Sequence, residues 1–198
     1  MQRRECLKAL AGGVAGILGL AGLGLPGEAL AARLPQAAYR RTSVPRAYVQ
    51  AAAQAGVPGR LLYAIALHES ALAFGPNMVA PWPWTLRMQG RPWRFNTYEE
   101  AVRQLTVAVD QLGLNYVYCG PMQVSWRVHQ ARLGTPAQAI NAYHNLAVGA
   151  SILRANYELA KGDWFRATAM YYTRDFSLSL PYARNVYDLL PNLVEELA

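Results

Sequence analysis

The sequence predicts a mostly helical α+β fold, built as a single domain with a small β or irregular lobe. The chain has 198 residues, which is enough for one domain with a sizeable core. Hydrophobic residues make up 53% of it and charged residues only 16%, and this composition excludes a disordered chain. Helical signals recur along most of the sequence, and one stretch rich in Pro, Trp and Gly, residues 74–96, interrupts them.

Residues 1–31 have the layout of a secretory signal peptide. Arg3 and Arg4 precede an apolar run of Ala, Gly and Leu, and the small residues Ala29 and Ala31 form a cleavage site. The paired arginines resemble the twin-arginine export signal, which is an address read by a receptor. We therefore expect an exported, periplasmic protein with no stable membrane span after cleavage; an uncleaved membrane helix is the alternative.

The net charge of +7 and the pI of about 9.6 suit an anionic partner, such as cell-wall polymer, a membrane surface or nucleic acid. Solubility alone is the alternative explanation. No run of Lys and Arg is dense enough to indicate DNA binding, so we expect no nucleic-acid partner. Cys6 lies in the leader and leaves Cys119 alone in the mature chain, which excludes an internal disulfide. No metal-ligand spacing appears, so we expect neither metal nor cofactor.

After a linker at residues 32–42, start and stop signals predict the helices of the domain at 43–198. Asn96 or Thr97, Thr135 and Asp163 are expected to cap helices. Before the first of these caps, the sequence from Trp84 to Asn96 predicts a hairpin that turns at Gln89-Gly90. The predicted helices span 46–55, 60–70, 97–112, 141–159 and 164–172, with others opening at Thr135-Pro136 and at Pro181.

One acidic residue stands in an apolar setting. In the helix at 60–70, Leu62, Ile65 and Ala66 form a stripe, and its next position is Glu69. Burial of a carboxyl group raises its pKa, so this group is expected to stay protonated near neutral pH and to act as a proton donor. Glycosidic bond cleavage needs such an acid. The alternative is a structural hydrogen bond or salt bridge at the helix end.

The other acids of the mature chain have ordinary explanations as helix caps, first-turn residues or surface charges. Asp175, in a loop after a pair of tyrosines, is the least explained of them. No second acid lies in an obviously apolar setting, so the sequence does not support a glycosidase with two carboxylates.

Four motifs follow one another along residues 57–190. They are Glu69-Ser70, the segment 120–124 (Gly-Pro-Met-Gln-Val), Asn145-Leu146 with Gly149, and the segment 169–172 (Ala-Met-Tyr-Tyr) followed by Tyr182. In this order they resemble the soluble lytic transglycosylase family, which implies a lysozyme-like fold. The segment 81–95 resembles a branch of that family found with conjugative elements and type IV secretion or pilus systems. The resemblance departs at Tyr172, where the family has Asn or His.

The resemblance implies a peptidoglycan lytic transglycosylase with a single catalytic acid/base, Glu69. The muramoyl 6-hydroxyl would attack its own C1, giving a 1,6-anhydromuramoyl end. Peptidoglycan strands are then the substrate, and a secretion or conjugation apparatus is a possible partner. The residues expected to bind substrate are Ser70, Met122, Gln123, Asn145, Tyr171, Tyr172 and Trp84.

Alternatives remain for several of these residues. Tyr171, placed by the resemblance near the carboxyl group, is otherwise a half-buried core tyrosine. Trp82, Trp84 and Trp93 either stack on sugar rings or pack the inserted lobe. Cys119 with His144 would make a Cys-His peptidase. For the whole protein, the alternatives are a lysozyme-type muramidase and a non-catalytic wall-binding assembly factor.

Overall fold

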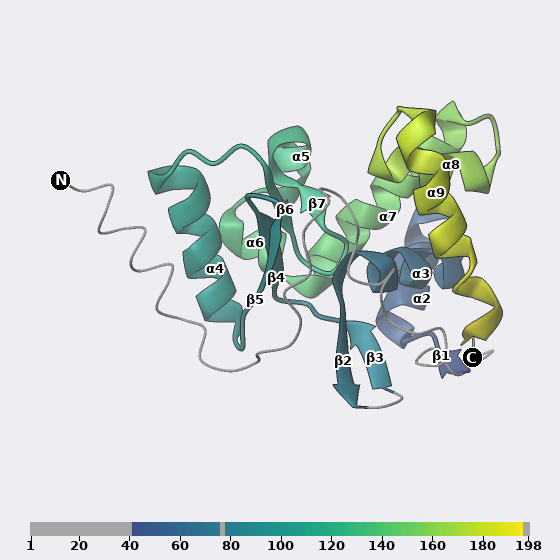
Figure 1. Cartoon of the computed structure of the whole chain (residues 1–198), viewed down its shortest axis with the longest axis horizontal. Coiled ribbons are helices and arrows are strands. Elements are labelled where there is room, and N and C mark those ends of the chain that lie inside the picture. The colour runs from purple at the N-terminus through teal and green to yellow at the C-terminus, as the bar shows by residue number, and fades with distance from the viewer. Residues whose placement is uncertain (1–40, 76–77, 196–198) are drawn as a thin grey trace.

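The computed structural model describes residues 41–75 and 78–195, and within them the expected mostly helical α+β fold is confirmed (Figure 1). The predicted signal peptide and nearly all of the predicted linker lie outside the described residues. In the described ranges, no helix combines the length and the hydropathy needed to cross a bilayer.

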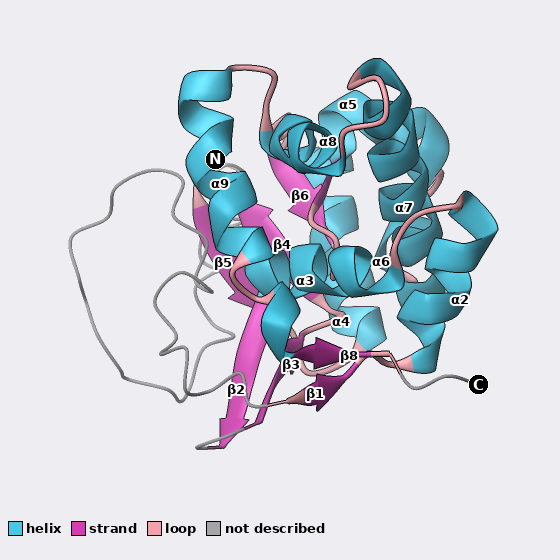
Figure 2. Ribbon diagram, turned by 90° about the vertical axis from the view of Figure 1, so that its right-hand side faces the viewer, coloured by secondary structure: helices cyan, strands magenta, loops and turns pink. Residues whose placement is uncertain are grey.

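Helix α3 (Gly59–Ser70) is the centre of the molecule. It contacts α2 (Arg46–Ala55) and α9 (Phe176–Tyr187), and Figure 2 shows it between the two. Ten of its twelve residues are buried, so the helix is buried on all sides rather than along one stripe. Glu69, in its last turn, is a partly exposed exception.

The C-terminal half is a stack of helices. The long helix α7 (Ala142–Leu159) contacts α2 and α8 (Trp164–Tyr172), and α8 contacts α9. The expected cap at Asp163 is confirmed, since its side chain accepts a hydrogen bond from the Arg166 N–H. This stack forms the upper right part of Figure 1.

The prediction that Pro181 opens the last helix is wrong. Helix α9 begins five residues earlier, where the Asp175 side chain caps it by accepting from the Ser177 N–H at 3.0 Å. This also explains Asp175, whose role the sequence left open. Pro181 sits inside the helix, where it lacks an N–H, but the buried face that carries Tyr182 and Val186 packs onto the core and holds the helix together.

A four-stranded antiparallel sheet forms the small lobe. Its strand order is β5 (Arg91–Arg94), β4 (Thr85–Met88), β6 (Val117–Cys119) and β7 (Val124–Ser125). The predicted hairpin is confirmed: β4 pairs with β5, and Gln89 and Gly90 have φ of 52° and 75° at the turn. Positive φ at both positions is what a two-residue hairpin loop requires.

The helices beside this sheet match the sequence only in part. Thr97 caps α4 (Tyr98–Thr106), which continues as a π-helix over Val107–Gln111, close to the predicted end. Thr135 caps the short α6 (Pro136–Ile140) with a full capping box. Helix α5 (Trp126–Leu133) was not predicted, because it follows β7 without a side-chain cap and is kinked at His129.

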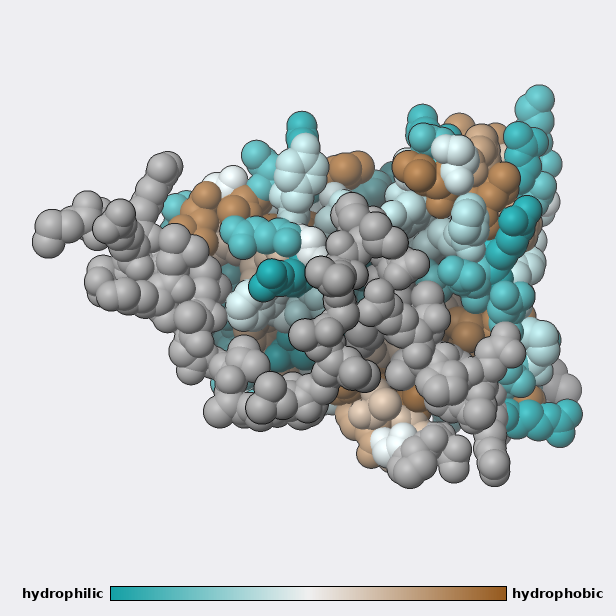
Figure 3. Space-filling model, in the orientation of Figure 1, coloured by the Kyte–Doolittle hydropathy of each residue, from teal (hydrophilic) through white to brown (hydrophobic). Residues whose placement is uncertain are grey.

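Two small pairs of strands complete the fold. Strands β2 (Ala71–Gly75) and β3 (Met78–Pro81) form an antiparallel ribbon that projects from the body (Figure 1), and Figure 3 shows apolar residues on it. Strand β1 (Thr42–Ser43) pairs in parallel with β8 (Leu193–Val194), and a short 3-10 helix (Leu190–Asn192) precedes β8. The boundary predicted for the linker is therefore one residue too late, since Thr42 already belongs to the domain.

Candidate active site

Glu69 opens into a groove between the sheet and helix α8. A cavity of about 310 Å³ holds its carboxyl group, and a second cavity of about 370 Å³ adjoins the first. The two cavities share four lining residues, Tyr118, Gln123, Tyr171 and Tyr172. Together they form one continuous groove, and Glu69 lines only the smaller of the two cavities.

The carboxyl group of Glu69 is held in a mostly apolar environment with one hydrogen-bond donor. Burial raises its pKa, while the positive charge of Arg87 and a hydrogen bond from Tyr182 act in the opposite direction. Burial prevails, so the pKa is raised overall. The Tyr182 hydroxyl donates to Oε1 of Glu69 at 2.8 Å. A carboxyl group in this setting favours the protonated form needed for proton donation.

Tyr171 lies near Glu69, as the resemblance implied, but it is not the hydrogen-bond donor to the carboxyl group. The hydroxyl of Tyr171 donates instead to the backbone carbonyl of Met122 at 3.0 Å, although Tyr171 lines the groove. Tyr182 takes the expected position, with its ring stacked on Tyr172 at 5.1 Å between centroids and edge-on to His68 at 4.7 Å. The spacing of Tyr182 and Val186, four residues apart on one helix face, was the sequence signal for an inward-facing tyrosine.

The floor of the groove consists of the segment 120–123 and Asn145 beneath it. The Asn145 side chain accepts from the Met122 N–H at 3.0 Å and donates to the carbonyls of Cys119 and Ala139 at 2.9 and 3.1 Å. Gly120 has φ of 72°, and a Cβ there would lie 2.5 Å from Asn145 Cγ. The loop is therefore fixed by a fully hydrogen-bonded amide and by the lack of a side chain above it.

Three residues expected to bind substrate form this support instead. Ser70 and Asn145 are fully buried, as is Met122, against which Gly149 packs so closely that a Cβ there would lie 2.8 Å from Met122 Cγ. The Ser70 hydroxyl donates to the carbonyls of Ala66 and Pro121, which ties the end of α3 to the floor. The prediction of direct contact is corrected for all three, because they are fully buried and line neither cavity.

Gln123 lies in the groove as expected, with half of its amide already used. It adopts a left-handed backbone with φ of 46°, which is unusual for a residue other than glycine. Its Nε2 donates to the carbonyls of Thr85 and Gly120 at 3.1 and 2.8 Å. Both N–H groups are therefore occupied, and the Oε1 atom is the part of this side chain available to accept a hydrogen bond from a ligand.

The tryptophans lie outside the groove. Trp84 packs against the core and meets Trp82 edge-on at 5.5 Å, and Trp82 donates from Nε1 to the Phe95 carbonyl at 2.8 Å. Trp93 likewise packs against the core. The expected stacking of Trp84 on sugar is thus not supported, because these rings join the β2–β3 ribbon to the sheet. The aromatic residues of the groove are tyrosines.

The sheet side of the groove, formed by Arg87 and Tyr118, was not predicted from the sequence. In β4, Leu86 and Met88 point into the core, so Arg87 points to the opposite face, and register places it across from Tyr118. The period-two alternation from Thr85 to Met88 was the available signal.

Two further reactive side chains, Cys119 and His68, are buried. Cys119 is fully buried and burial raises the pKa of its thiol, while the His144 ring lies 3.1 Å from the Arg132 carbonyl, so the geometry does not support a Cys-His peptidase. Burial, with the charge of Arg87, lowers the pKa of His68 to about 4, and neither of its ring nitrogens has a hydrogen-bond partner in the described part of the chain.

Within the described ranges, Glu69 is the only carboxyl group that lines either cavity. The same ranges contain no cluster of three His, Cys, Asp or Glu side chains able to hold a metal ion. No family model, curated protein or solved structure matches this chain. Its function is therefore inferred from the chemistry of its own residues.

Proposed function

We propose that this protein is a peptidoglycan lytic transglycosylase that cleaves the β-1,4 bond between N-acetylmuramoyl and N-acetylglucosaminyl residues. The observation that carries the proposal is the carboxyl group of Glu69, with its raised pKa, which is the only one that the described residues contribute to the groove. A hydrolase with two catalytic carboxylates needs a second acid about 5–10 Å away across the groove. A transglycosylase needs one, because the substrate supplies its own nucleophile.

In the reaction, Glu69 acts first as a proton donor and then as a proton acceptor. Glu69 donates its proton to the glycosidic oxygen as the bond from that oxygen to muramoyl C1 breaks. The muramoyl 6-hydroxyl oxygen then bonds to C1, and its proton returns to Glu69. The products are a 1,6-anhydromuramoyl end and a free 4-hydroxyl, and no water is consumed. The hydrogen bond from Tyr182 stabilises the carboxylate that exists between the two transfers.

The spatial arrangement of the four sequence motifs supports the proposal. Ser70, next to Glu69, bonds to the floor at Pro121, and the floor bonds to Asn145. Tyr171 bonds to the floor from helix α8, and Tyr182 reaches Glu69 from α9. Segments separated by more than one hundred residues thus converge on one carboxyl group. Convergence of this kind is expected of a catalytic site and is not required for folding alone.

The cellular role is part of the same proposal. The twin-arginine signal predicted for residues 1–31 would export the enzyme to the periplasm, where peptidoglycan is its substrate. The likeness of the segment 81–95 to enzymes of conjugative elements and type IV secretion or pilus systems favours local opening of the wall for such an apparatus.

Digestion of purified sacculi tests the proposal. Intact protein and Glu69→Gln are incubated with sacculi in parallel, and the released muropeptides are analysed by mass spectrometry. We expect anhydromuramoyl ends with the intact protein, and a rate lower by about 10²–10⁴-fold with Glu69→Gln, the usual contribution of general acid–base catalysis. Circular dichroism confirms that the variant is folded.

Three other results would each redirect the assignment. Reducing ends in place of anhydro ends identify a muramidase. Release that persists in Glu69→Gln removes Glu69 from the mechanism. Binding to sacculi with no turnover by the intact protein identifies a wall-binding factor.

A further inference from the structure

Arg87 brings a positive charge into the groove that no described residue neutralises by contact. It lines the same cavity as Glu69, and it forms no ion pair or hydrogen bond within the described ranges. The acid that lines the same cavity is Glu69, which must be protonated, and therefore neutral, to act in the proposed reaction. In the reactive state the cavity then holds a cation without a counter-charge.

A second arginine lies on the same face of the sheet. Register pairs Arg94 with Thr85, two residues before Arg87 on β4, so the two arginines are diagonal neighbours. One Arg94 nitrogen donates to the Ala71 carbonyl at 3.0 Å, while its Nε is buried without a partner. Burial, and after it the positive charge of Arg87, lowers the pKa of Arg94. Two neighbouring cations raise the affinity of this face for an anion.

We propose that Arg87, with the charge of Arg94 behind it, binds a carboxylate carried by the muramoyl residue beside the scissile bond. This inference rests on the proposed function and adds a substrate determinant to it. A guanidinium group matches the planar, two-oxygen geometry of a carboxylate. Tyr118, directly across from Arg87, offers a ring wall along the same cavity.

Two parts of peptidoglycan supply such a carboxylate. In strands without peptides, the muramoyl lactyl group ends in a free carboxylate. In strands with peptides, that group is an amide, and the free carboxylates belong to the stem peptide. Both present the same chemistry to Arg87, so the distinction between them requires an experiment.

The test measures binding with cleavage switched off. Full-length Glu69→Gln protein, with and without Arg87→Gln, is titrated calorimetrically with three tetrasaccharides of alternating N-acetylglucosamine and N-acetylmuramic acid. The first carries stem peptides, the second has free lactyl carboxylates, and the third has those carboxylates converted to neutral methylamides. Arg91→Gln is the matched control, because Arg91 is exposed on the same hairpin and lines neither cavity.

We expect Arg87→Gln to weaken binding of at least one anionic tetrasaccharide by about tenfold or more, and of the neutral one by less than about twofold. Loss with the second ligand identifies the lactyl carboxylate, and loss confined to the first identifies the stem peptide. Arg87→Lys should retain part of the affinity, and added salt should weaken binding only where Arg87 is present. Arg91→Gln should leave all three affinities unchanged.

Equal weakening of all three ligands by Arg87→Gln, or no weakening of any, would overturn the inference. The cleavage assay with sacculi separates this failure from failure of the proposed function. Charge-dependent binding without cleavage by the intact protein would refute the transglycosylase and keep the anion site. Cleavage with charge-independent binding would keep the transglycosylase and refute the anion site.

Discussion

The floor and the sheet side of the groove differ in how many hydrogen bonds their polar side chains make. In the floor, the Asn145 amide makes three hydrogen bonds, and Gly120 leaves room for it. On the sheet side, Arg87 makes no hydrogen bond with the described part of the chain, and its neighbour Arg94 makes one. The floor therefore contributes to folding, whereas the sheet side has donors without partners, which we propose bind a ligand. Substitutions in the floor should change stability, and those around Glu69 should change chemistry.

The largest effect is expected from Asn145→Ala. It removes three buried hydrogen bonds, and a buried polar group left without a partner costs about 1–3 kcal/mol. We expect a loss of about 3 kcal/mol or more in the free energy of unfolding, measured by urea denaturation. Asn96→Ala, at an exposed position, should change it by less than about 0.5 kcal/mol. A loss below about 1 kcal/mol for Asn145→Ala would show that the floor is not held by this amide.

Gly120→Ala should cost about 2–3 kcal/mol. The new Cβ must accept a left-handed backbone, which costs about 1–2 kcal/mol, and it must also displace the Asn145 side chain. Gly90→Ala measures the cost of the left-handed backbone alone, because Gly90 has a similar φ of 75° and nothing within 4 Å of the added carbon. Denaturant midpoints of the two variants give the difference. If the two are equal, crowding against Asn145 plays no part.

Glu69 should make stability depend on pH. Its folded pKa is raised, so its protonated form stabilises the folded state below the unfolded pKa, and this stability is lost as pH rises through the folded pKa. The free energy of unfolding of the intact protein should therefore fall relative to Glu69→Gln as pH rises, by no more than about 1.4 kcal/mol per pH unit. Denaturation of both proteins from mildly acidic to neutral pH measures this. Parallel curves would mean that Glu69 is not desolvated.

Tyr182→Phe should shift the pH dependence of catalysis. The hydrogen bond from Tyr182 lowers the pKa of Glu69, so its loss raises that pKa, and the alkaline limb of kcat/KM should move to higher pH. Tyr171→Phe is the control, because that hydroxyl bonds to a backbone carbonyl instead of the carboxyl group. A shift of the same size in both variants would point to a general change of the groove.

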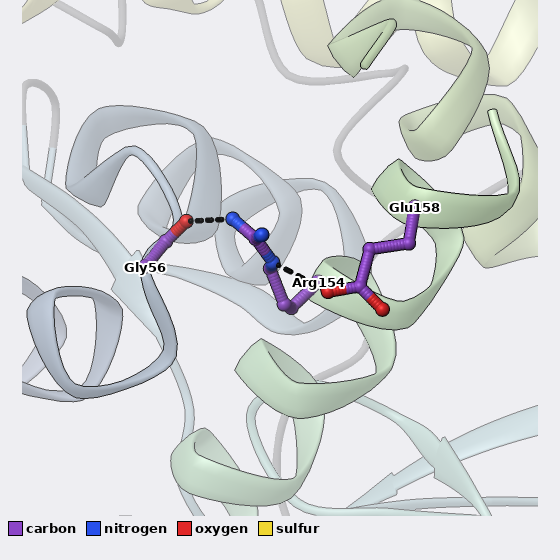
Figure 4. A network of polar contacts seen from close by, with 3 residues as sticks. All are labelled: Gly56, Arg154 and Glu158. Atoms are coloured by element: carbon purple, nitrogen blue, oxygen red, sulfur yellow. Dashed lines mark hydrogen bonds and ion pairs between the residues drawn. The ribbon is translucent and has the colours of Figure 1, made fainter. Parts of the chain in front are cut away.

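The smallest effects are expected far from the groove, between α7 and α2. Figure 4 shows Arg154 bonded to the Gly56 carbonyl at 3.2 Å and to Glu158 at 3.0 Å. The ion pair is exposed, so Glu158→Gln should cost less than about 0.5 kcal/mol. Arg154→Met also removes the bond to Gly56 and should cost about 1 kcal/mol. Urea midpoints compare the two losses of stability. A larger loss for Glu158→Gln would show that the ion pair matters more than the bond to Gly56.

The sequence by itself determined most of the helices, the hairpin and the acid. Capping residues such as Thr97, Thr135 and Asp163 act within one turn of chain, and the Gln89-Gly90 turn depends on two adjacent residues. Glu69 was found because a carboxyl group is out of place in an apolar helix. These features are readable since their causes are local.

Only the tertiary structure decided which neighbours surround that acid. Tyr171 and Tyr182 both reach the site from helices that follow it by about one hundred residues, and helix packing determines which hydroxyl meets the carboxyl group. The residue types of Ser70, Met122 and Asn145 are typical of a binding site. All three are fully buried, however, and support the groove from beneath. Arg87 lies in the groove because of the register of its strand. Such roles depend on distances between segments remote in the chain, which no local pattern encodes.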